Sequence, residues 1–316
     1  MRAVLAGLVA GLVLSAVVVG WAIARAPNPS NFAAVVAERE PATRARPVAL
    51  SRIAPFLREA VVATEDERFW RHHGVDVEGL LRAAAFDATH LTTAQGASTI
   101  TEQLSKDLYL GGNDHSPWRK LEDAVTAFRL ETLASKDAIL AAYMNTVYLG
   151  DGNFGVARAS ERYFGAPPSR LSLPQASLLA GLIQAPSTYD PFNDPSAARV
   201  RQAVVLTSMI RTHDVTAQEA DAALSAPLRL ANGRTLPAVG PVDLSVGPAF
   251  SMGELVAGVA TMVAAGLAIV LVRRRRRRGR VRSARSRVAP AMAWRAATIG
   301  AMAIGFVIAV RSFRVG

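Results

Sequence analysis

The sequence predicts a mainly α-helical protein with an apolar segment at each end. Apolar residues recur at steps of three and four over most of residues 50–225, which is the period of an amphipathic helix. No stretch alternates polar and apolar residues with β-branched side chains, as a half-buried strand would. Helices are expected at residues 51–70, 75–88, 118–149 (with an irregularity at 134–136), 156–164, 174–184, 195–212 and 216–224.

The apolar segments at the two ends have the character of membrane helices. Residues 1–25 contain an apolar run with one polar side chain, long enough to cross a bilayer as a helix. We interpret this run as a retained anchor, because the h-region of a signal peptide is shorter and Pro27 disfavours cleavage just before it. Residues 254–272 form a second predicted transmembrane helix. Residues 295–312 hold a shorter apolar stretch, which fits either a further span or an interfacial helix.

The net charge of +11 is concentrated in one short run. Ten arginines and no acidic residue lie within residues 273–287, and the chain before residue 273 is slightly acidic. A basic nucleic-acid-binding domain is therefore excluded, and the run instead marks the cytoplasmic side of the preceding apolar helix. This orientation places residues 26–253 outside the cytoplasmic membrane. The chain has no cysteine, which excludes disulfides and thiolate chemistry.

Shifts in composition set the predicted domain boundaries. A folded domain is expected at residues 50–228, between linkers at residues 26–49 and 229–253 that are rich in proline, glycine or mixed charge. An arginine-rich cytoplasmic segment, residues 273–294, follows the second apolar helix. The chemistry of the protein is therefore expected in the central domain.

A polar cluster ends an apolar helix within residues 60–74. The helix delivers two adjacent carboxylates, Glu65 and Asp66, and two aromatic residues, two histidines and a glycine follow within eight residues. A carboxylate against an aromatic wall has its ionised form disfavoured, which raises its pKa toward the range useful for proton transfer. The alternative interpretation is a solvated helix end with a glycine stop.

Two more polar patterns follow along the chain. Thr99 and Glu102 match a capping box, which does not account for Gln103 and Lys106, a polar pair on successive turns of the same short helix. A dense group of charges, residues 119–123, begins the next helix, where its arginine and lysine are badly placed for the helix dipole. The group is either a solvated face or a set of charges held there by something else.

These patterns, in this order, resemble the glycosyltransferase family 51 domain, the peptidoglycan transglycosylase of class A penicillin-binding proteins and of monofunctional transglycosylases. The resemblance covers about residues 50–212 and rests on five motifs. The motif ED-x-x-F-x-x-H-x-G matches Glu65, Asp66, Phe69, His72 and Gly74. The other matches are Gly96, Ser98, Thr99, Thr101, Gln103, Leu104 and Lys106, then Arg119 and Lys120, then Ser135, Lys136, Ile139, Leu140, Tyr143, Asn145, Tyr148 and Gly150, and then residues 163–165 and 178–186.

The resemblance implies a lysozyme-like, mostly helical fold that polymerises lipid II and releases undecaprenyl pyrophosphate. Glu65 would act as the general base on a sugar hydroxyl, with inversion at the anomeric carbon. Lys106, Arg119 and Lys120 would supply the charge that stabilises the pyrophosphate, and Asp123 would be the second catalytic carboxylate. The other residues expected to bind substrate are Asp66, Phe69, His72, Ser98, Thr99 and Gln103.

Three positions depart from the family pattern. The second functional glutamate is replaced by Asp123, which is one methylene shorter, and misplacement by about 1 Å can cost roughly 10²-fold in rate. Glu102 stands in the usual T-Q-Q, and Asp107 stands where asparagine is common. Both add negative charge near a site meant for pyrophosphate, so the site is either retuned or weakly active. Asp123 would act through the surrounding cations or through a bound Mg²⁺ or other divalent cation, and no organic cofactor is expected.

Three functions remain open from the sequence: a monofunctional transglycosylase, a lytic glycosidase, and a scaffold that binds lipid II or cell-wall synthesis and division proteins without turnover. The transpeptidase motifs S-x-x-K and K-T-G are absent, so penicillin binding is not expected. The cationic group favours a pyrophosphate leaving group over glycosidic hydrolysis. The expected partners are lipid II, the growing glycan strand and the membrane, with the catalytic domain on the periplasmic side of a bacterial inner membrane.

Overall fold

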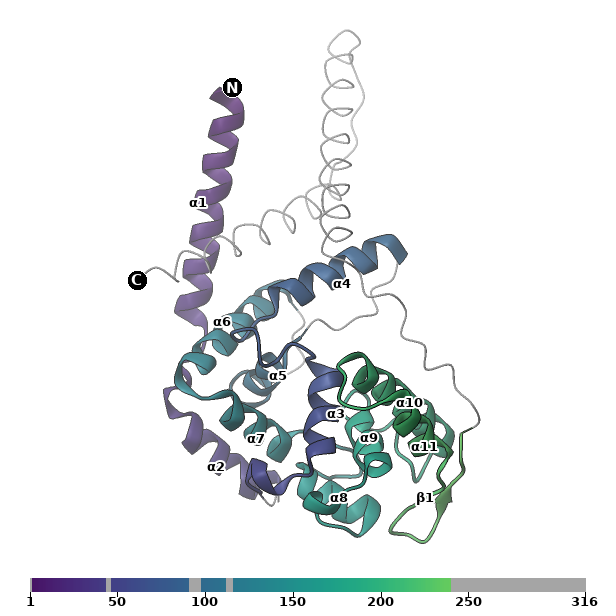
Figure 1. Cartoon of the computed structure of the whole chain (residues 1–316). Helices are drawn as coiled ribbons and strands as arrows, with labels where there is room; N and C mark the ends of the chain where they lie inside the picture. Colours follow the sequence, from purple (N-terminus) through teal and green to yellow (C-terminus); the bar gives the residue numbers. More distant parts are fainter. Residues whose placement is uncertain (1, 44–46, 91–97, 112–115, 240–316) are drawn as a thin grey trace, which may run out of the picture. The chain divides into compact units, whose positions relative to one another are not determined.

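The computed structural model describes residues 2–43, 47–90, 98–111 and 116–239, which are mainly helical as predicted (Figure 1). The chain divides into two compact units. The larger unit comprises Ala26–Asp76 and Ala97–Ala249, and the smaller comprises Met1–Arg25, Val77–Gly96 and Phe250–Gly316. The predictions for residues 254–272, 273–294 and 295–312 lie outside the described residues.

The smaller unit contributes two described helices. Helix α1 spans Arg2–Arg25, and the Arg25 guanidinium lies 5.1 Å from the centre of the Trp21 ring. Helix α4 spans Val77–His90 and carries an ion pair between Glu78 and Arg82, at 3.7 Å. Over the part of the chain that the structure describes, no helix combines the length and apolarity needed to cross a membrane. The two transmembrane helices therefore stay predictions.

The larger unit is a helical domain with one small hairpin among its described residues. Its helices are α2 (Phe32–Thr43), α3 (Pro55–Glu65), α5 (Ile100–Ser105), α6 (Pro117–Leu133), α7 (Lys136–Thr146), α8 (Val156–Phe164), α9 (Leu173–Leu182), α10 (Pro195–Arg211) and α11 (Ala217–Ser225). A π-helical turn, Lys106–Leu110, continues α5, and strands β1 (Leu228–Arg229) and β2 (Thr235–Leu236) pair antiparallel. Short 3₁₀ turns lie at Pro29–Asn31, Leu50–Arg52 and Pro168–Arg170.

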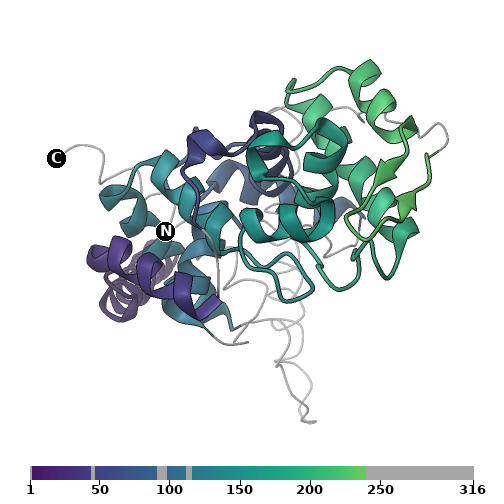
Figure 2. The same ribbon diagram turned by 90° about the horizontal axis from the view of Figure 1, so that it is seen from below.

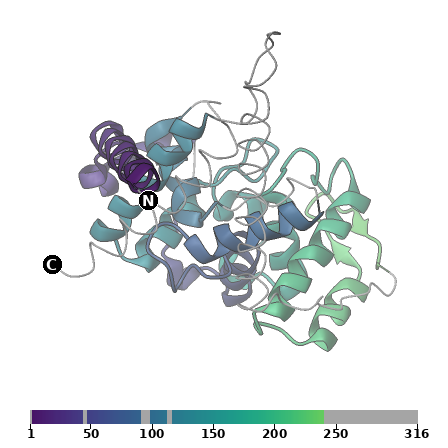
Figure 3. The ribbon, with the colours of Figure 1, turned by 90° about the horizontal axis from the view of Figure 1, so that it is seen from above.

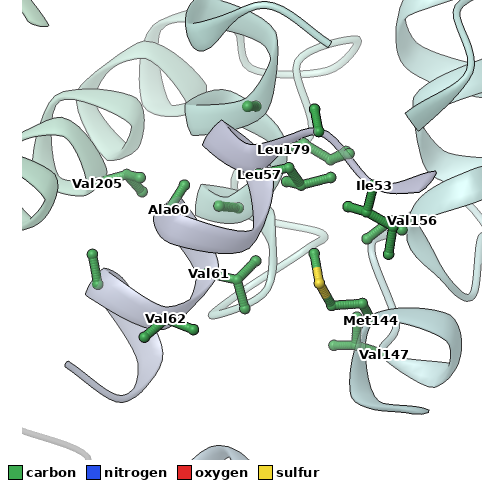
Figure 4. Close-up of a cluster of buried hydrophobic side chains, with 14 of the residues drawn as sticks. Ile53, Leu57, Ala60, Val61, Val62, Met144, Val147, Val156, Leu179 and Val205 are labelled. Carbon is green, nitrogen blue, oxygen red and sulfur yellow. The ribbon is translucent and has the colours of Figure 1, made fainter. Parts of the chain in front are cut away.

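Helix α3 lies at the centre of the core. It packs against α9 and α10, while α5 packs against α6 and α7. Figure 4 shows side chains of α3 beside Met144 of α7, Val147 just after that helix, Leu179 of α9 and Val205 of α10. Because this core fixes α3, it also fixes the position of Glu65, the last residue of the helix. The other labelled members of the cluster are Ile53, Leu57, Ala60, Val61, Val62 and Val156.

Helix boundaries follow local signals in the sequence. The long pattern from residue 118 to 149 divides at the predicted irregularity, where the Ser135 hydroxyl accepts a hydrogen bond from the Ala138 N–H at 3.2 Å and caps α7. Helix α8 ends at Gly165, whose φ of +64° is the left-handed conformation that terminates helices. The capping boxes predicted for α5 and α11 are both present.

Part of the segment predicted as a linker, residues 26–49, is folded. It contains α2, and Phe32 and Val36, four residues apart on this helix, pack against the main core together with Val48. The Asn145 side chain accepts a hydrogen bond from the Val48 N–H and donates one to its carbonyl, at 2.9 and 3.0 Å. The proline and charged residues of this segment led to its prediction as a linker, but Phe32 and Val36 of α2 pack against the core of the domain.

The C-terminal boundary of the domain also lies later than predicted. The hairpin β1–β2 begins at Leu228 and extends to Leu236, past the predicted boundary, and Arg199 of α10 is almost fully buried. Its guanidinium donates hydrogen bonds to the carbonyls of Leu224, Ala226 and Pro237 at 2.7–2.9 Å. A buried arginine needs such partners, so these residues belong to the fold. In Figures 2 and 3, the α10–α11 region and α2 lie at opposite ends of the unit.

Candidate active site

The adjacent carboxylates Glu65 and Asp66 have different surroundings. Glu65 is the last residue of α3, and Asp66 is the residue that caps it in a non-helical conformation. The Asp66 side chain is buried, lies 2.9 Å from His72 Nε2 and accepts a hydrogen bond from the Ile100 N–H at 3.0 Å. An anion at the N-terminus of α5 is favoured by the helix dipole, so Asp66 joins the end of α3 to the start of α5.

Phe69 and His72 are both buried, and their rings pack against each other. Phe69 is fully buried, its ring packs edge-on against Trp70 and His72, and Lys136 Nζ lies 4.3 Å from its centre. His72 is buried with its Nε2 on Asp66. Asp66, Phe69 and His72 are thus buried and contact one another or neighbouring elements, and their contact with the substrate stays a prediction.

Thr99 is likewise a structural residue. Its hydroxyl donates to the Gly74 carbonyl at 2.6 Å and accepts from the Glu102 N–H at 3.0 Å, and the residue is buried. Gly74 has a φ of +80°, and a Cβ there would lie 2.6 Å from the Phe128 backbone nitrogen. The motif glycine is thus required by a close backbone approach, and Thr99 ties α5 to it, while the substrate contact expected of Thr99 stays a prediction.

Glu65 receives its hydrogen bond from a neutral donor. Gln103 Nε2 donates to Glu65 Oε2 at 3.0 Å, and the Tyr143 hydroxyl donates to Gln103 Oε1 at 2.8 Å, which fixes the orientation of the amide. Burial raises the pKa of Glu65, while the Gln103 hydrogen bond and the charge of Arg201 oppose this rise. A half-buried carboxylate with a raised pKa and a single neutral donor suits a general base.

Arg201 is a residue of this region that the sequence pattern did not reveal. It lies on α10, donates from Nε to the Gly181 carbonyl at 3.3 Å, and its guanidinium lies 5.8 Å from the centre of the Tyr189 ring. Its charge favours the ionised form of Glu65. Along the sequence it resembles any charged helix residue, and only the packing of α10 against α3 brings it near the base.

The charged group at the start of α6 lies around Arg119. Its guanidinium donates to the carbonyls of Leu110 and Gly111, the latter at 2.9 Å, and so satisfies the end of the π-helical turn. Arg119 Nε lies 3.8 Å from Asp123 Oδ1, and Arg119 Nη1 lies 3.9 Å from Glu122 Oε2. Arg119 is unfavourably placed for the dipole of α6, but the carbonyls of the preceding turn and two carboxylates hold its guanidinium in place.

Lys120 reaches across to the start of α5. Its Nζ donates to Ser98 Oγ at 2.7 Å and lies 3.2 Å from Glu102 Oε1. Glu102 is buried, and burial raises its pKa while the Lys120 charge and the Thr99 N–H lower it. Of the two added acids, Glu102 thus pairs with a cation of the group, whereas Asp107 is exposed on the π-helical turn.

Asp123 lies among three cations. It is buried, and burial raises its pKa against the opposing charges of Lys120, Arg119 and Lys106. Its Oδ1 accepts no hydrogen bond within the described part of the chain. Lys106 lies on the π-helical turn and is half-buried, and its charge is one of those that lower the pKa of Asp123. We call Lys106, Arg119, Lys120 and Asp123 the cationic cluster.

These residues do not fit a divalent cation. No group of three or more His, Cys, Asp or Glu side chains that could hold a metal occurs in the described residues. Asp123, the carboxylate of the cationic cluster, has three positive charges around it, and these repel a divalent cation. The donor set instead suits an anion with several oxygens, such as a phosphate group.

The third motif lysine, Lys136, has a structural role. Its Nζ lies 2.7 Å from Glu131 Oε1, which also accepts a hydrogen bond from the Thr101 hydroxyl at 2.6 Å. This contact joins the start of α7 to α5 and α6. Lys136 therefore supports the helix that carries Gln103 and Glu102, rather than adding charge to the cationic cluster.

Comparisons with known proteins identify the family of this chain. A family model described as Transglycosylase matches residues 33–210. The Cupriavidus necator protein named Putative transglycosylase H16_A0665 is 42% identical over 183 residues, which are 58% of this chain and 78% of that protein. Penicillin-binding protein 1A of Neisseria gonorrhoeae is 42% identical over 172 residues, and that of Escherichia coli K12 is 41% identical over 175.

The match spans only part of these larger relatives: 54% of this chain against 21% of the Neisseria protein, and 55% against 20% of the Escherichia coli protein. The crystal structure of Penicillin-Binding Protein 1A from Haemophilus influenzae is 24% identical, covers 59% of this chain and 18% of that one, and has a TM-score of 0.37. Because the family model covers more than half of the 316 residues, and the Cupriavidus necator relative is matched over most of its length, this chain belongs to the transglycosylase family.

Proposed function

We propose that this transglycosylase is a peptidoglycan glycosyltransferase that polymerises lipid II into glycan strands and releases undecaprenyl pyrophosphate. The observation that supports this proposal is that two neighbouring residues of α5 contact the two parts of the candidate site. Gln103 on this helix contacts the candidate base Glu65, and its neighbour Glu102 contacts Lys120 of the cationic cluster. One short helix thus links a proton acceptor to a group of cations, which are the two requirements of this reaction.

In the proposed reaction, Glu65 accepts the proton of a sugar hydroxyl as that oxygen attacks the anomeric carbon of the donor. The bond from this carbon to the diphosphate oxygen breaks, and the diphosphate leaves with the electron pair. Lys106, Arg119 and Lys120 stabilise the charge that develops on the leaving group. A single displacement with the base on the far face inverts the anomeric carbon.

The proposal is for a glycosyltransferase without transpeptidase chemistry. The S-x-x-K and K-T-G motifs are absent from the 316 residues, and the Cupriavidus necator relative matched over 78% of its length is itself named a transglycosylase. We also place residues 26–253 outside the cytoplasmic membrane, close to a lipid-linked substrate. Reporter fusions at Gly233 and Arg285 should report opposite sides of the membrane, and the same side for both contradicts this topology.

The decisive experiment is polymerisation of labelled lipid II by the purified full chain in detergent. The parent should form glycan strands, and Glu65→Gln, which keeps size but cannot accept the proton, should not. Lipid II binding without polymerisation by the parent would favour the scaffold, for which the replacement of the second glutamate by Asp123 is the motivating observation. Release of soluble fragments from intact peptidoglycan would favour a lytic glycosidase.

A further inference from the structure

Glu102 is a buried carboxylate that serves two elements at once. It is 3% exposed and lies in the first turn of α5. Its Oε2 accepts a hydrogen bond from the Thr99 N–H at 2.9 Å, and its Oε1 lies 3.2 Å from Lys120 Nζ. One oxygen therefore completes the cap of α5, and the other pairs with a cation from α6.

The cap alone does not require a negative charge. A capping box forms with either glutamate or glutamine at this helix position, and the family pattern has glutamine here. A glutamine in place of Glu102 would keep the bond to the Thr99 N–H but would present a neutral amide to Lys120. The negative charge of Glu102 therefore matters for its contact with Lys120 and not for the cap, which a neutral glutamine would also form.

Lys120 is exposed and yet held in place. Its side chain is 46% exposed, while its ammonium contacts both Ser98 Oγ, at 2.7 Å, and Glu102 Oε1. An ammonium group has three donors, so two are used and one remains for a ligand. Lysine side chains lose considerable rotamer freedom on ordering, and the contacts with Ser98 and Glu102 impose that order before any ligand binds.

We propose that Glu102 is a positioning residue for Lys120, which it holds beside Ser98 while weakening the binding of a free diphosphate to the cationic cluster. The proposal rests on the function proposed above. A fixed anion near the diphosphate repels it in the ground state. An ordered cation, however, stabilises the charge on the leaving group without reorganising during the reaction. Losing Glu102 should therefore tighten diphosphate binding and slow turnover.

The three lysines of the chain give a direct test. Lysine labelled at Cε and Nζ in the full chain should give one NMR signal each for Lys106, Lys120 and Lys136, with Lys120→Arg as the assignment control. In Glu102→Gln the Lys120 signal should take on the relaxation of a mobile side chain, and that of Lys136 should not change. Glu122→Gln removes the same charge from a carboxylate that pairs with Arg119, and should leave Lys120 ordered. An ordered Lys120 in Glu102→Gln overturns the proposal.

Inorganic pyrophosphate then tests the functional half. Its Kd, followed on the labelled lysines, should fall by about 3- to 10-fold in Glu102→Gln, because one repelling charge is lost. In lipid II polymerisation the same variant should lower kcat by about 3- to 10-fold without raising KM. Unchanged or weaker pyrophosphate binding contradicts the proposal. If the parent does not polymerise lipid II, the function proposed above fails, while the two binding measurements still decide the role of Glu102.

Discussion

The carboxylates Glu65 and Asp123 differ in the charge of the side chains around them. Glu65 is a single carboxylate that receives a hydrogen bond from neutral Gln103, with Tyr143 behind it and one arginine acting through its charge. In the cationic cluster, Asp123 is embedded among three cations. Burial raises the pKa of both carboxylates, but different groups oppose this rise: the Gln103 hydrogen bond and the Arg201 charge at Glu65, and three cations at Asp123.

This difference fits the separate roles proposed for Glu65 and Asp123. A base must be able to change its protonation state near neutral pH, so its neighbours should be polar and mostly uncharged. An acid that organises cations must stay charged, so it should be surrounded by them. The following predictions test this contrast.

The largest effect is expected for Glu65→Gln. The amide keeps the size and can still bond Gln103, but it cannot accept a proton. Polymerisation of lipid II should fall by about 10²-fold or more, with the thermal unfolding midpoint close to that of the parent. Near-parental turnover by this variant would remove Glu65 from the role of base.

Asp123 should be the next most sensitive position. Asp123→Ala removes a buried carboxylate from among three cations and should lower polymerisation by about 10²-fold, measured by the same assay. Asp123→Glu should keep or raise the rate, because it restores the family side chain. Glu122→Ala should change little, since successive helix residues face different directions. An active parent that tolerates Asp123→Ala would leave the second motif without its carboxylate.

Removing the neutral donor should shift the pH dependence of the reaction. The Gln103 hydrogen bond lowers the pKa of Glu65, so in Gln103→Leu this pKa should rise further. Because the ionised base is the active form, the acidic limb of the kcat/KM profile should move to higher pH. Turnover at neutral pH should fall by about tenfold, since a hydrogen bond to a charged group is lost. An acidic limb that stays in place would separate Gln103 from the titration of the base.

Tyr143→Phe should have the smallest effect. It removes the hydroxyl that orients the Gln103 amide, a neutral hydrogen bond, and should lower kcat/KM by about 2- to 10-fold with a small upward shift of the acidic limb. Tyr163→Phe is the matched control, because Tyr163 is also buried and its hydroxyl donates to the Leu149 carbonyl in the core. The control should change thermal stability without moving the pH profile. If Tyr143→Phe and Tyr163→Phe gave the same pH profile of kcat/KM, the Tyr143 hydroxyl would have no role in the titration of Glu65.

The sequence by itself determined the local features of this protein. The cap at Thr99, the helix end at Gly165 and the division of the long helical pattern near residues 134–136 all depend on neighbouring residues, and all were predicted. The cap at Ser135 was not predicted. The motifs also indicated which side chains gather at the site. They could not show that Phe69 and Thr99 are buried, because a motif records which residues recur and not which of them face solvent.

Only the tertiary structure decided the partner of each charge. Glu65 and Asp66 are adjacent in sequence, yet one meets Gln103 and the other meets His72 and the start of α5. Gln103 and the start of α5 lie 38 and 34 residues from these carboxylates, so those contacts depend on how α3 and α5 pack. The same holds for Glu102 and Lys120, whose charges look like solvated helix residues until folding places them 3.2 Å apart. Burial then fixes their roles, because a carboxylate removed from water must find a donor or a cation.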